Sequence, residues 1–380
     1  MRAVVTGGAG FIGRHLAFRL LREGWEVTIA DSFSPGVHGP RGRLPLELAR
    51  AVRLVEGDVR DERVIAAALD GCHAVLHLAA ETGTGQSMYS AAAYESVNVG
   101  STARIIDYLT STRGHAVERL ILASSRAVYG EGRWSCAQDG AVYPEPRRRA
   151  QLEAGRFDPR CPLCAGPCVP VPTDEDSPVS PSSFYGATKA MQEQAMRLLS
   201  LTLDLPACVL RYQNVYGPGQ ALRNPYTGVL SLFASRTRQR LPIQVFEDGR
   251  PSRDFVYIDD VVEATWRSLQ ADLTGMQTLN VGSGVATSIH TVAEQLREAV
   301  GSDAEMTVTG EFRLGDIRYS CADLTRAQAV IGYEPRWDLT AGLEELLAWV
   351  EGETVEPNAY ESSLEEMRSR GLMGQSTSPR

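Results

Sequence analysis

A glycine-rich turn constrains the fold of this chain more than any other feature of its sequence. Residues 6–13 read TGGAGFIG, so Gly7, Gly10 and Gly13 stand between a short apolar segment, RAVVT, and the helical pattern of residues 11–24. Glycines at this spacing permit a tight turn from a strand into a helix and let the helix pack close to the strand. The segment therefore predicts the first half of a β-α-β unit in a parallel sheet.

Strand-like and helix-like segments alternate through the first third of the chain. Apolar strand candidates occupy residues 25–31, 52–58, 74–80 and 120–125, and helical patterns lie near 61–69 and 92–112. Strands that alternate with helices pack as a parallel sheet with helices on both faces. We therefore predict an α/β fold with a Rossmann-type doubly wound parallel sheet and a smaller, mixed α/β C-terminal domain.

Charge and composition argue against several classes of protein. The formal net charge is −9, which disfavours binding to nucleic acid or to an anionic membrane surface. No apolar run approaches the roughly 20 residues that span a bilayer, and the N-terminus enters a strand pattern without a signal peptide. Seven cysteines form no even disulfide framework, which agrees with a reducing compartment. We expect a cytoplasmic protein that binds neither nucleic acid nor membranes.

The glycine turn also predicts a dinucleotide. Backbone amides at a helix N-terminus bind a pyrophosphate, and Asp31 at the end of the next strand accepts hydrogen bonds from a ribose diol. The Asp31 carboxylate would repel a 2′-phosphate, so the pattern favours NAD over NADP. Asp58 and Val59 are expected to flank the adenine, although Asp58 alone is also a common strand terminator. The predicted cofactor site consists of Gly7, Gly10, Phe11, Ile12, Gly13, Asp31, Asp58, Val59, Leu78, Ala79, Ala80 and Asn98, with Tyr185 and Lys189.

Three residues indicate chemistry beside this cofactor. SFYGATK places Tyr185 and Lys189 four residues apart on one helical face, and Ser125 ends a predicted strand in ASSRAVYG. A tyrosine with a pKa of about 10 is a poor base at neutral pH, and a lysine ammonium one turn away would lower that pKa. Alone, a Tyr-x-x-x-Lys pair is more often a surface feature. Beside a dinucleotide turn and a serine at a strand end, it predicts a catalytic site.

The rest of the chain divides into three parts. Residues 131–181 are rich in Pro, Arg and Cys and have little periodicity, so we expect an insertion within an NAD-binding domain at 1–212. Beyond residue 213 the elements are smaller, and we expect a substrate-binding domain at 213–354, with part of 255–285 returning to the main sheet. The polar residues 355–380 predict an irregular tail.

At these motifs the sequence resembles the extended short-chain dehydrogenase/reductases, in particular the nucleotide-sugar epimerases and dehydratases. The resemblance covers roughly residues 1–350 apart from the insertion. It implies that the substrate is a nucleotide-diphosphate sugar. It also implies that Ser125 hydrogen-bonds the 4-hydroxyl of the sugar, that Tyr185 is the base and that Lys189 is its partner. The helices near 92–112 and 184–202 resemble those through which the family forms homodimers.

The same resemblance implies a substrate site in the C-terminal half. LRYQNVYGPGQ carries Asn214, which matches an asparagine that binds the sugar diphosphate. Arg253 in SRDFVYIDD, and Arg313 and Asp316 in RLGDIR, match residues that grip phosphate and the nucleotide ribose. The implied substrate site consists of Gln86, Ser87, Asn214, Asn224, Arg253, Arg313 and Asp316.

The two residues after Ser125 discriminate among the reactions of this family. The 4,6-dehydratases carry an Asp–Glu pair there, and decarboxylases that form pentose nucleotides carry a glutamate directly before VYG. This chain has Arg126 and Ala127 instead. The resemblance therefore implies epimerisation at carbon 4 through a 4-keto sugar, with NAD regenerated in each cycle and retained. Family epimerases have a small residue where Arg126 stands, so this side chain either faces away or reaches a carboxylate or phosphate of the substrate.

Peripheral stretches resemble one subgroup of the family, the dTDP-L-rhamnose 4-epimerases. These stretches are SPGVHG at 34–39, TGTGQSMYS at 82–90, NPYTGVLSLFASR at 224–236, VFEDGRPSRDFV at 245–256 and GDIRYSCAD at 315–323. The subgroup implies a dTDP-linked sugar. A UDP-hexose or UDP-uronate 4-epimerase and a nucleotide-sugar decarboxylase or dehydratase are the alternatives. A non-catalytic NAD-sensing protein is another, against which the intact Ser125, Tyr185 and Lys189 argue.

The insertion carries a separate pattern of cysteines. CPLCAGPC holds Cys161, Cys164 and Cys168, and Cys136 lies near the start of the insertion. Thiolates at C-x2-C spacing suit a tetrahedral, structural zinc ion, which would order a segment with little apolar periodicity. We therefore predict a zinc site formed by these four cysteines, with free thiols or a labile disulfide as the alternatives.

Overall fold

The computed structural model describes residues 1–39, 42–222, 228–353 and 359–377. Its centre is a seven-stranded parallel sheet with the strand order β13-β9-β5-β4-β1-β2-β3. The strands are β1 (Arg2–Thr6), β2 (Glu26–Asp31), β3 (Arg53–Glu56), β4 (Ala74–His77), β5 (Arg119–Ser125), β9 (Ala207–Tyr212) and β13 (Met276–Val281). The chain order reverses between β1 and β4, and ligands bind at such a switch point. The Rossmann-type fold is confirmed.

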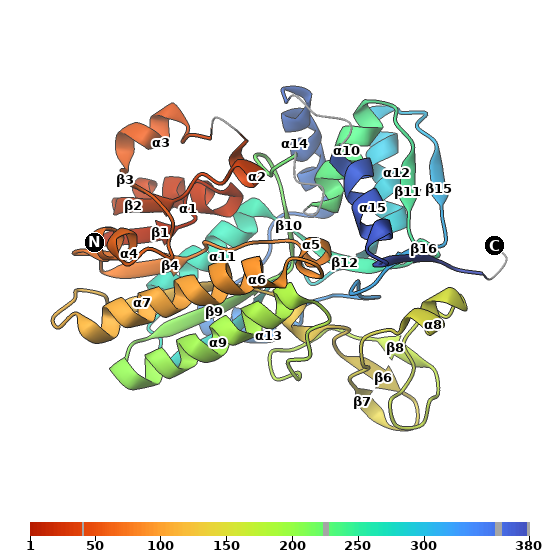
Figure 1. Ribbon diagram of the computed structural model, residues 1–380, viewed down its shortest axis with the longest axis horizontal. Coiled ribbons are helices and arrows are strands. Elements are labelled where there is room, and N and C mark those ends of the chain that lie inside the picture. The colour runs from red at the N-terminus through yellow and green to blue at the C-terminus, as the bar shows by residue number, and fades with distance from the viewer. Residues whose placement is uncertain (40–41, 223–227, 354–358, 378–380) are drawn as a thin grey trace.

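Helices cover both faces of this sheet, as Figure 1 shows. The main ones are α1 (Phe11–Arg22), α4 (Glu62–Leu69), α7 (Gly100–Ser111), α9 (Phe184–Leu203) and α11 (Ile258–Gln270). α1 packs beside α11, and α7 packs between α4 and α9. Side chains alternate along each strand, so Val5 of β1 faces the α1 side and Val4 faces the α7 side.

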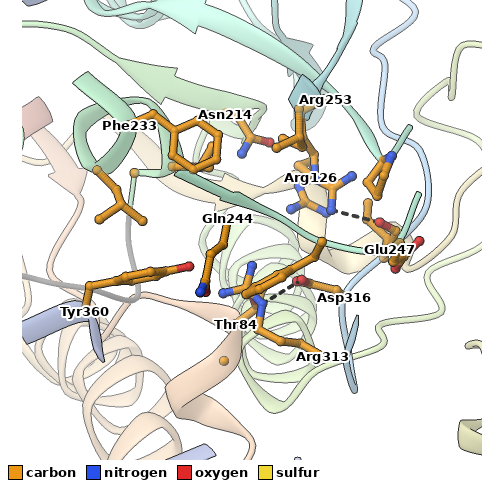
Figure 2. A pocket seen from close by; sticks show the side chains of 18 residues that line it. Thr84, Arg126, Asn214, Phe233, Gln244, Glu247, Arg253, Arg313, Asp316 and Tyr360 are labelled. Atoms are coloured by element: carbon orange, nitrogen blue, oxygen red, sulfur yellow. Dashed lines mark hydrogen bonds and ion pairs between the residues drawn. The ribbon is translucent and has the colours of Figure 1, made fainter. Parts of the chain in front are cut away.

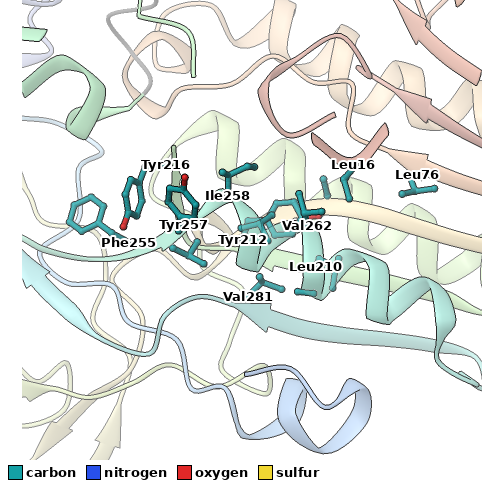
Figure 3. Close-up of a cluster of buried hydrophobic side chains, with 14 of the residues drawn as sticks. Leu16, Leu76, Leu210, Tyr212, Tyr216, Phe255, Tyr257, Ile258, Val262 and Val281 are labelled. Carbon is teal, nitrogen blue, oxygen red and sulfur yellow. The ribbon is translucent and has the colours of Figure 1, made fainter. Parts of the chain in front are cut away.

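A continuous apolar core joins the sheet to the α1–α11 layer. Leu16 of α1, Leu76 of β4, Leu210 of β9, Val262 of α11 and Val281 of β13 lie together in this core (Figure 3). Burial of large aliphatic side chains stabilises the fold by roughly 1.5–3 kcal/mol each. The core extends into the C-terminal region, so the site above the sheet has a rigid base.

Short helical segments link these elements. They are α2 (Pro35–His38), α3 (Leu46–Ala51), α5 (Thr84–Ser87), α6 (Ala91–Tyr94), the π-helical turn η1 (Glu95–Val99) and the 3-10 turn η2 (Arg126–Tyr129). The helix predicted near 92–112 is thus three consecutive segments, α6, η1 and α7. The wider turn η1 contains Asn98, which is fully buried.

The C-terminal region is a smaller mixed α/β unit. Its strands form two small sheets, β10 (Asn214–Tyr216), β12 (Ser252–Tyr257) and β14 (Ala286–Ser288) in one, and β11 (Ile243–Val245) and β15 (Met306–Val308) in the other. Its helices are α10 (Val229–Arg238), α12 (Ile289–Val300), α13 (Thr325–Ile331) and α14 (Leu339–Glu351). Among the described helices we find none with the length and hydrophobicity that a bilayer crossing requires.

The predicted irregular tail is wrong where the structure describes it. Residues 359–369 form α15 (Ala359–Ser369), and β17 (Met373–Gln375) pairs antiparallel with β16 (Glu311–Arg313). Tyr360, Leu364 and Met367 are spaced along one face of α15 and are buried against the C-terminal unit. This apolar face is narrow on an otherwise polar helix, so composition alone suggested no structure.

The insertion folds as a small module at one side of the molecule (Figure 1). It contains an antiparallel sheet with the order β7-β6-β8, built from β6 (Trp134–Cys136), β7 (Gly140–Val142) and β8 (Cys168–Pro170), and the helix α8 (Arg149–Glu153). β6 is the central strand and pairs with both neighbours. The module therefore has its own hydrogen-bonded framework.

Candidate active site

The glycine-rich turn joins β1 to α1 beside the switch point of the sheet. Gly7 has a φ of 68°, which favours glycine, and a Cβ there would lie 2.8 Å from the Cα of Ala79. A Cβ on Gly13 would collide with the carbonyl oxygen of Gly7. No side chain therefore stands between the turn and the end of β4, and the N-terminal amides of α1 are available to an anionic group.

A cavity of about 450 Å³ opens above this turn, and we call it the cofactor cavity. It extends from the end of β2 to the start of α9, so it spans the length of the sheet edge that a dinucleotide would occupy. The predicted cofactor residues that line it are Gly7, Gly10, Phe11, Ile12, Gly13, Asp31, Asp58, Val59, Leu78, Ala79, Ala80, Tyr185 and Lys189.

Asp31 is held in position at the far end of this cavity. Its Oδ2 accepts a hydrogen bond from the Ala9 amide at 3.0 Å, and its Oδ1 accepts one from the Phe33 amide at 2.9 Å. His38 of α2 lies 3.4 Å from Oδ1. A carboxylate has about four acceptor sites, so capacity remains for ribose hydroxyls. A side-chain-free turn for the pyrophosphate and an oriented carboxylate for a ribose together fit NAD.

Asn98 does not line the cofactor cavity, contrary to the sequence prediction. Its side-chain oxygen accepts a hydrogen bond from the Glu81 amide at 2.8 Å, and its nitrogen donates to Thr188 Oγ1 at 2.9 Å and to the Glu81 carbonyl at 3.2 Å. These bonds tie η1 to α9 and to the loop after β4. Asn98 therefore supports the cavity wall from behind.

Tyr185 lies at the start of α9, where that helix meets the end of β5. Ser183 caps the helix by accepting a hydrogen bond from the Gly186 amide, and a Cβ on Gly186 would collide with the Ala127 carbonyl. This close approach brings Tyr185 beside Ser125. Burial raises the pKa of Tyr185, while a hydrogen bond with Ser125 and the charge of Arg126 lower it.

Lys189 lies one helical turn further along α9 and is buried. Its Nζ donates a hydrogen bond to the carbonyl oxygen of Ala123 at 2.8 Å, and burial lowers its pKa to about 7. From the sequence, Lys189 is expected to lower the pKa of Tyr185. In the structure Lys189 lines the cofactor cavity together with Tyr185, and the charge of Arg126 lowers the Tyr185 pKa.

A second cavity of about 210 Å³, the inner cavity, lies against Ser125 and Tyr185. Arg126, Ala127 and Asn214 also line it. The amide of Ala127 donates to Ser125 Oγ at 3.2 Å, which orients the hydroxyl. Among the described residues, no aspartate or glutamate lines the inner cavity. The hydroxyls that line this cavity, those of Ser125 and Tyr185 among them, are thus its candidate acid–base groups.

A third cavity of about 150 Å³, the outer cavity, continues from the inner one toward the C-terminal unit. Figure 2 shows Arg126, Arg253 and Arg313 around it, with Asp316 paired to Arg313. Asn214 lines both cavities, and its side-chain oxygen is buried without a hydrogen-bond partner among the described residues. The outer cavity is therefore cationic and bears an unsatisfied polar group.

The charges around the outer cavity are unevenly compensated. Arg313 Nε lies 3.0 Å from Asp316 Oδ2, and Arg253 donates to the carbonyls of Ser252 and Ile317. Burial raises the pKa of Asp316, but the arginines, first Arg313 and then Arg253, hold it below its usual range. Burial, with a further contribution from Arg253, lowers the pKa of Arg126 to about 9. The excess of positive charge suits an anionic ligand.

Two of the predicted substrate residues lie outside these cavities. Ser87 is fully buried and donates to the Thr84 carbonyl at 2.6 Å, and Gln86 is absent from the lining. Their helix α5 instead presents Thr84 and Gly85, one turn earlier, to the outer cavity. Asn224 lies outside the described residues.

Sequence analysis missed the aromatic wall of the outer cavity. Tyr360 from α15, Phe233 from α10 and Phe246 after β11 line it. The Arg236 guanidinium lies 5.4 Å from the ring centroid of Tyr360, and the Arg313 guanidinium lies 5.0 Å from the ring centroid of Phe246. The spacing of Tyr360, Leu364 and Met367 is the sequence signal that would have revealed α15.

The predicted cysteine site is also only partly assembled. Cys136, Cys161 and Cys164 come together with Asp139, and one ligand atom of each lies within 4.8 Å of the others. Cys168 is outside that group, although it lies opposite Cys136 in the pairing of β6 with β8; its sulfur is 3.9 Å from the Gly166 carbonyl oxygen. Asp139 takes its place, from the turn after β6.

The sheet topology, and a tyrosine and a lysine on one helix beside a glycine turn, define an extended short-chain dehydrogenase/reductase. The sequence model of the NAD dependent epimerase/dehydratase family matches residues 3–152 and 163–282, and the chain belongs to that family. The match is interrupted at residues 153–162, which lie inside the insertion.

Individual relatives agree with this assignment. A dTDP-L-rhamnose 4-epimerase of Burkholderia thailandensis is 41% identical over 351 residues, which cover 92% of this chain and 94% of that relative. The structure of MoeE5 in complex with UDP-glucuronic acid and NAD has a TM-score of 0.74 and 28% identity, covering 92% of this chain and 99% of its own. The Thermus thermophilus UDP-glucose 4-epimerase complex with NAD has a TM-score of 0.72 and 26% identity, covering 93% and 100%.

Proposed function

We propose that this protein is an NAD-dependent nucleotide-sugar 4-epimerase and that its substrate is dTDP-L-rhamnose. The family assignment and the NAD-bound neighbours support the cofactor and the reaction class. The most identical of the relatives described above acts on a dTDP-linked sugar, which favours dTDP over UDP. In this proposal residues 1–212 hold NAD and residues 213–354 hold the nucleotide sugar, with Tyr360 of α15 added to that second site.

One observation carries the choice of epimerisation. The inner cavity beside Tyr185 is lined, among the described residues, by hydroxyl, amide, guanidinium and apolar groups and by no carboxylic acid. Elimination of water or loss of a carboxylate needs additional acid–base groups beside the sugar. Transfer of a hydride with one proton at a single carbon needs only the hydroxyls that are present.

The residues of the inner cavity divide this work between them. NAD bound in the cofactor cavity supplies the hydride acceptor and donor. Tyr185 removes the proton of the sugar 4-hydroxyl and later returns it, and Ser125 hydrogen-bonds the same oxygen. Lys189, which lines the cofactor cavity beside Tyr185, would help to hold the cofactor. The 4-keto sugar turns within the inner cavity and receives the hydride on its other face.

The outer cavity provides the grip on the diphosphate and the nucleotide. Arg126 has no hydrogen-bonding or ion-pairing partner in the described part of the chain and lines both cavities, so we assign it to a phosphate of the substrate. Arg253, Arg313 and Asn214 complete this polar surface, and Asp316 accepts from the ribose. Of the two roles that the sequence leaves open for Arg126, we therefore favour an anionic partner in the substrate.

Product analysis tests the proposal. We would incubate the protein in D₂O with dTDP-L-rhamnose, UDP-glucose, UDP-galactose and UDP-glucuronate and follow each by NMR. The expected result is the carbon-4 epimer of dTDP-L-rhamnose, formed without deuterium at carbon 4, because the hydride returns from the cofactor. Conversion of a UDP-sugar alone favours the UDP-hexose or UDP-uronate alternative. Release of CO₂ identifies a decarboxylase, and a stable 4-keto product identifies a dehydratase. The absence of any turnover identifies a protein that binds NAD without catalysis.

We also propose that the protein is a cytoplasmic homodimer. Phe184, Met191 and Leu198 follow each other at seven-residue intervals on α9 and are 48%, 52% and 61% exposed. An apolar stripe of this kind on a long helix beside α7 suits a second copy that presents the same two helices. A structural zinc ion in the insertion is part of the proposal.

A further inference from the structure

The cysteine module of the insertion has the geometry of a metal site. Asp139 Oδ2 lies 3.4 Å from the sulfur of Cys136 and 3.1 Å from that of Cys161, and the sulfurs of Cys136 and Cys164 are 3.5 Å apart. Ligands of a tetrahedral zinc ion, at about 2.3 Å for sulfur and about 2.0 Å for oxygen, lie roughly 3.5–3.8 Å from each other. The three distances are close to these values or slightly shorter, and all four ligand atoms lie within 4.8 Å of one another, so small shifts would bring them around one zinc ion.

Two tight turns present these ligands to each other. Cys136 ends β6 and Asp139 lies in the turn to β7, whereas Cys161 and Cys164 lie in one loop closed by the hydrogen bond from the Cys161 amide to the Gly166 carbonyl. The Leu163 amide points at the Cys161 sulfur at 3.4 Å, which stabilises a thiolate. Each turn thus contributes two ligands separated by two residues, as in small zinc modules.

Within its own sheet the module has only a small apolar core, although beyond that sheet Leu152 and Phe157 pack against Phe312 and Arg147 forms buried ion pairs. The buried cluster within its sheet consists of Trp134 and Val142 with two cysteines, Cys136 and Cys161. A unit of this size cannot be ordered by so small an apolar core, and modules of this kind use a metal or disulfides instead. The structure records all four cysteines of the insertion as free thiols. A metal is the cross-link that the remaining geometry permits.

We propose that the insertion binds one structural zinc ion through Cys136, Asp139, Cys161 and Cys164, with Cys168 outside the ligand set. Three thiolates and one carboxylate at tetrahedral spacing match zinc in donor type and geometry and leave no open position for a substrate. This site is independent of the proposed epimerase activity, since no reacting group touches it.

The zinc site also supports the substrate-binding wall. Arg147 of the insertion is buried and donates to Glu131 at 2.9 Å, to Glu247 at 2.8 Å and to the Asp316 carbonyl at 3.0 Å. Glu247 and Asp316 line the outer cavity. An ordered module therefore holds the Arg147 side chain in place. Arg147 in turn holds Glu247 and the backbone of Asp316 in place beside the outer cavity. This makes Arg147 a positioning residue.

Metal analysis of defined variants tests the ligand set. Protein purified without chelator is expected to contain about one zinc per chain, and so is the Cys168→Ser control. Cys164→Ser is expected to hold less than about a tenth of that amount. Asp139→Cys completes a set of four thiolates, so it should retain zinc and release it to a chelator at least tenfold more slowly than the unmodified protein. Slower zinc release from Asp139→Cys is a gain of binding, so it cannot be explained by a variant that fails to fold.

Two spectroscopic readings complete the test. Cobalt in place of zinc should give the absorption of a tetrahedral thiolate complex, and metal removal should raise hydrogen exchange of the β6, β7 and β8 amides at least tenfold. The inference is overturned if the purified protein holds no zinc and its four thiols react freely. It is equally overturned if zinc survives in Cys164→Ser, if Cys168→Ser loses it while Asp139→Ala keeps it, or if iron fills the site.

Discussion

At the scale of single residues, the hydroxyl of Tyr185 stands where two cavities meet, beside the hydroxyl of Ser125 and the guanidinium of Arg126. Tyr185→Phe removes the base and keeps the ring that packs against Tyr94. We expect turnover to fall at least about a hundredfold, as for the loss of a general base, while bound NAD is unchanged. Initial rates and the NAD released on denaturation measure both, and a near-normal rate would exclude Tyr185 from the mechanism.

The pH dependence of turnover tests the role of Arg126. Burial raises the pKa of Tyr185, and Arg126 is one of two groups that oppose this rise. A base acts in its deprotonated form, so the rate at saturating substrate should increase with pH through the Tyr185 pKa. In Arg126→Met that pKa rises further, and the ascending limb should move to higher pH. The Arg126→Lys control should leave the limb close to its original place; an unmoved limb in the methionine variant would show that Arg126 has no electrostatic effect on Tyr185.

At the scale of secondary-structure elements, α9 has two different faces, one that lines the cofactor cavity and one that is exposed and that we propose as the dimer contact. Its inner side carries Tyr185 and Lys189, and its outer side carries the exposed Met191 in the apolar stripe. Met191→Glu places an acid at the centre of the proposed dimer contact and should shift the protein from dimer to monomer in sedimentation velocity at micromolar concentration. Leu46→Glu on α3 alters a leucine that is 65% exposed elsewhere and should leave the dimer intact. A dimer that persists in the Met191 variant, or a monomer without any change, contradicts this interface.

The helix α15 closes one end of the outer cavity through Tyr360. Removing the ring in Tyr360→Ala eliminates aromatic contacts worth about 1–1.5 kcal/mol, so KM for the nucleotide sugar should rise roughly tenfold. The value of kcat should change little, because α15 is remote from Tyr185. Tyr360→Phe retains the ring and should behave like the original protein. Steady-state kinetics distinguish these outcomes, and an unaltered KM would remove α15 from the substrate site.

The elements that sequence analysis predicted correctly are those with a strong local signal. The turn at Gly7 needs glycine for reasons of backbone conformation, and Tyr185 and Lys189 lie on one helix four residues apart, so spacing alone relates them. The residues that it misplaced depend on tertiary contacts. Asn98 lies on a π-helical turn that rotates it behind the cavity, and Asp139 approaches the cysteines only because the turn after β6 faces the loop at Cys161.

At the scale of the whole molecule, the largely buried Arg318 connects the insertion with the C-terminal unit. Arg318 pairs with Asp158 of the insertion at 2.7 Å and with Glu247 at 3.2 Å, and its backbone amide donates to Glu131 at 2.8 Å. Loss of one partner from a buried pair leaves an uncompensated charge and destabilises a protein by roughly 3–5 kcal/mol. These contacts join the insertion and the C-terminal unit beside the outer cavity.

The proposed reaction returns the hydride to the substrate, which makes a prediction for the intact enzyme. NAD should copurify with the protein, and turnover should proceed without added cofactor and without accumulation of NADH. Absorbance at the NADH band during the reaction, together with the NAD content of the purified protein, measures this. A requirement for NAD in amounts that match the substrate consumed would show that the enzyme is a net dehydrogenase instead.

The closing of the outer cavity by α15 has a consequence for the order in which the enzyme is made. The glycine turn, β1 to β5 and the start of α9 leave the ribosome well before α15, which follows every other element of the cavity in chain order. The face that receives the dinucleotide can thus assemble early in synthesis. The wall that we propose for the nucleotide sugar is complete only when Tyr360 has been added, so a nascent chain would acquire its proposed cofactor surface before its proposed substrate surface.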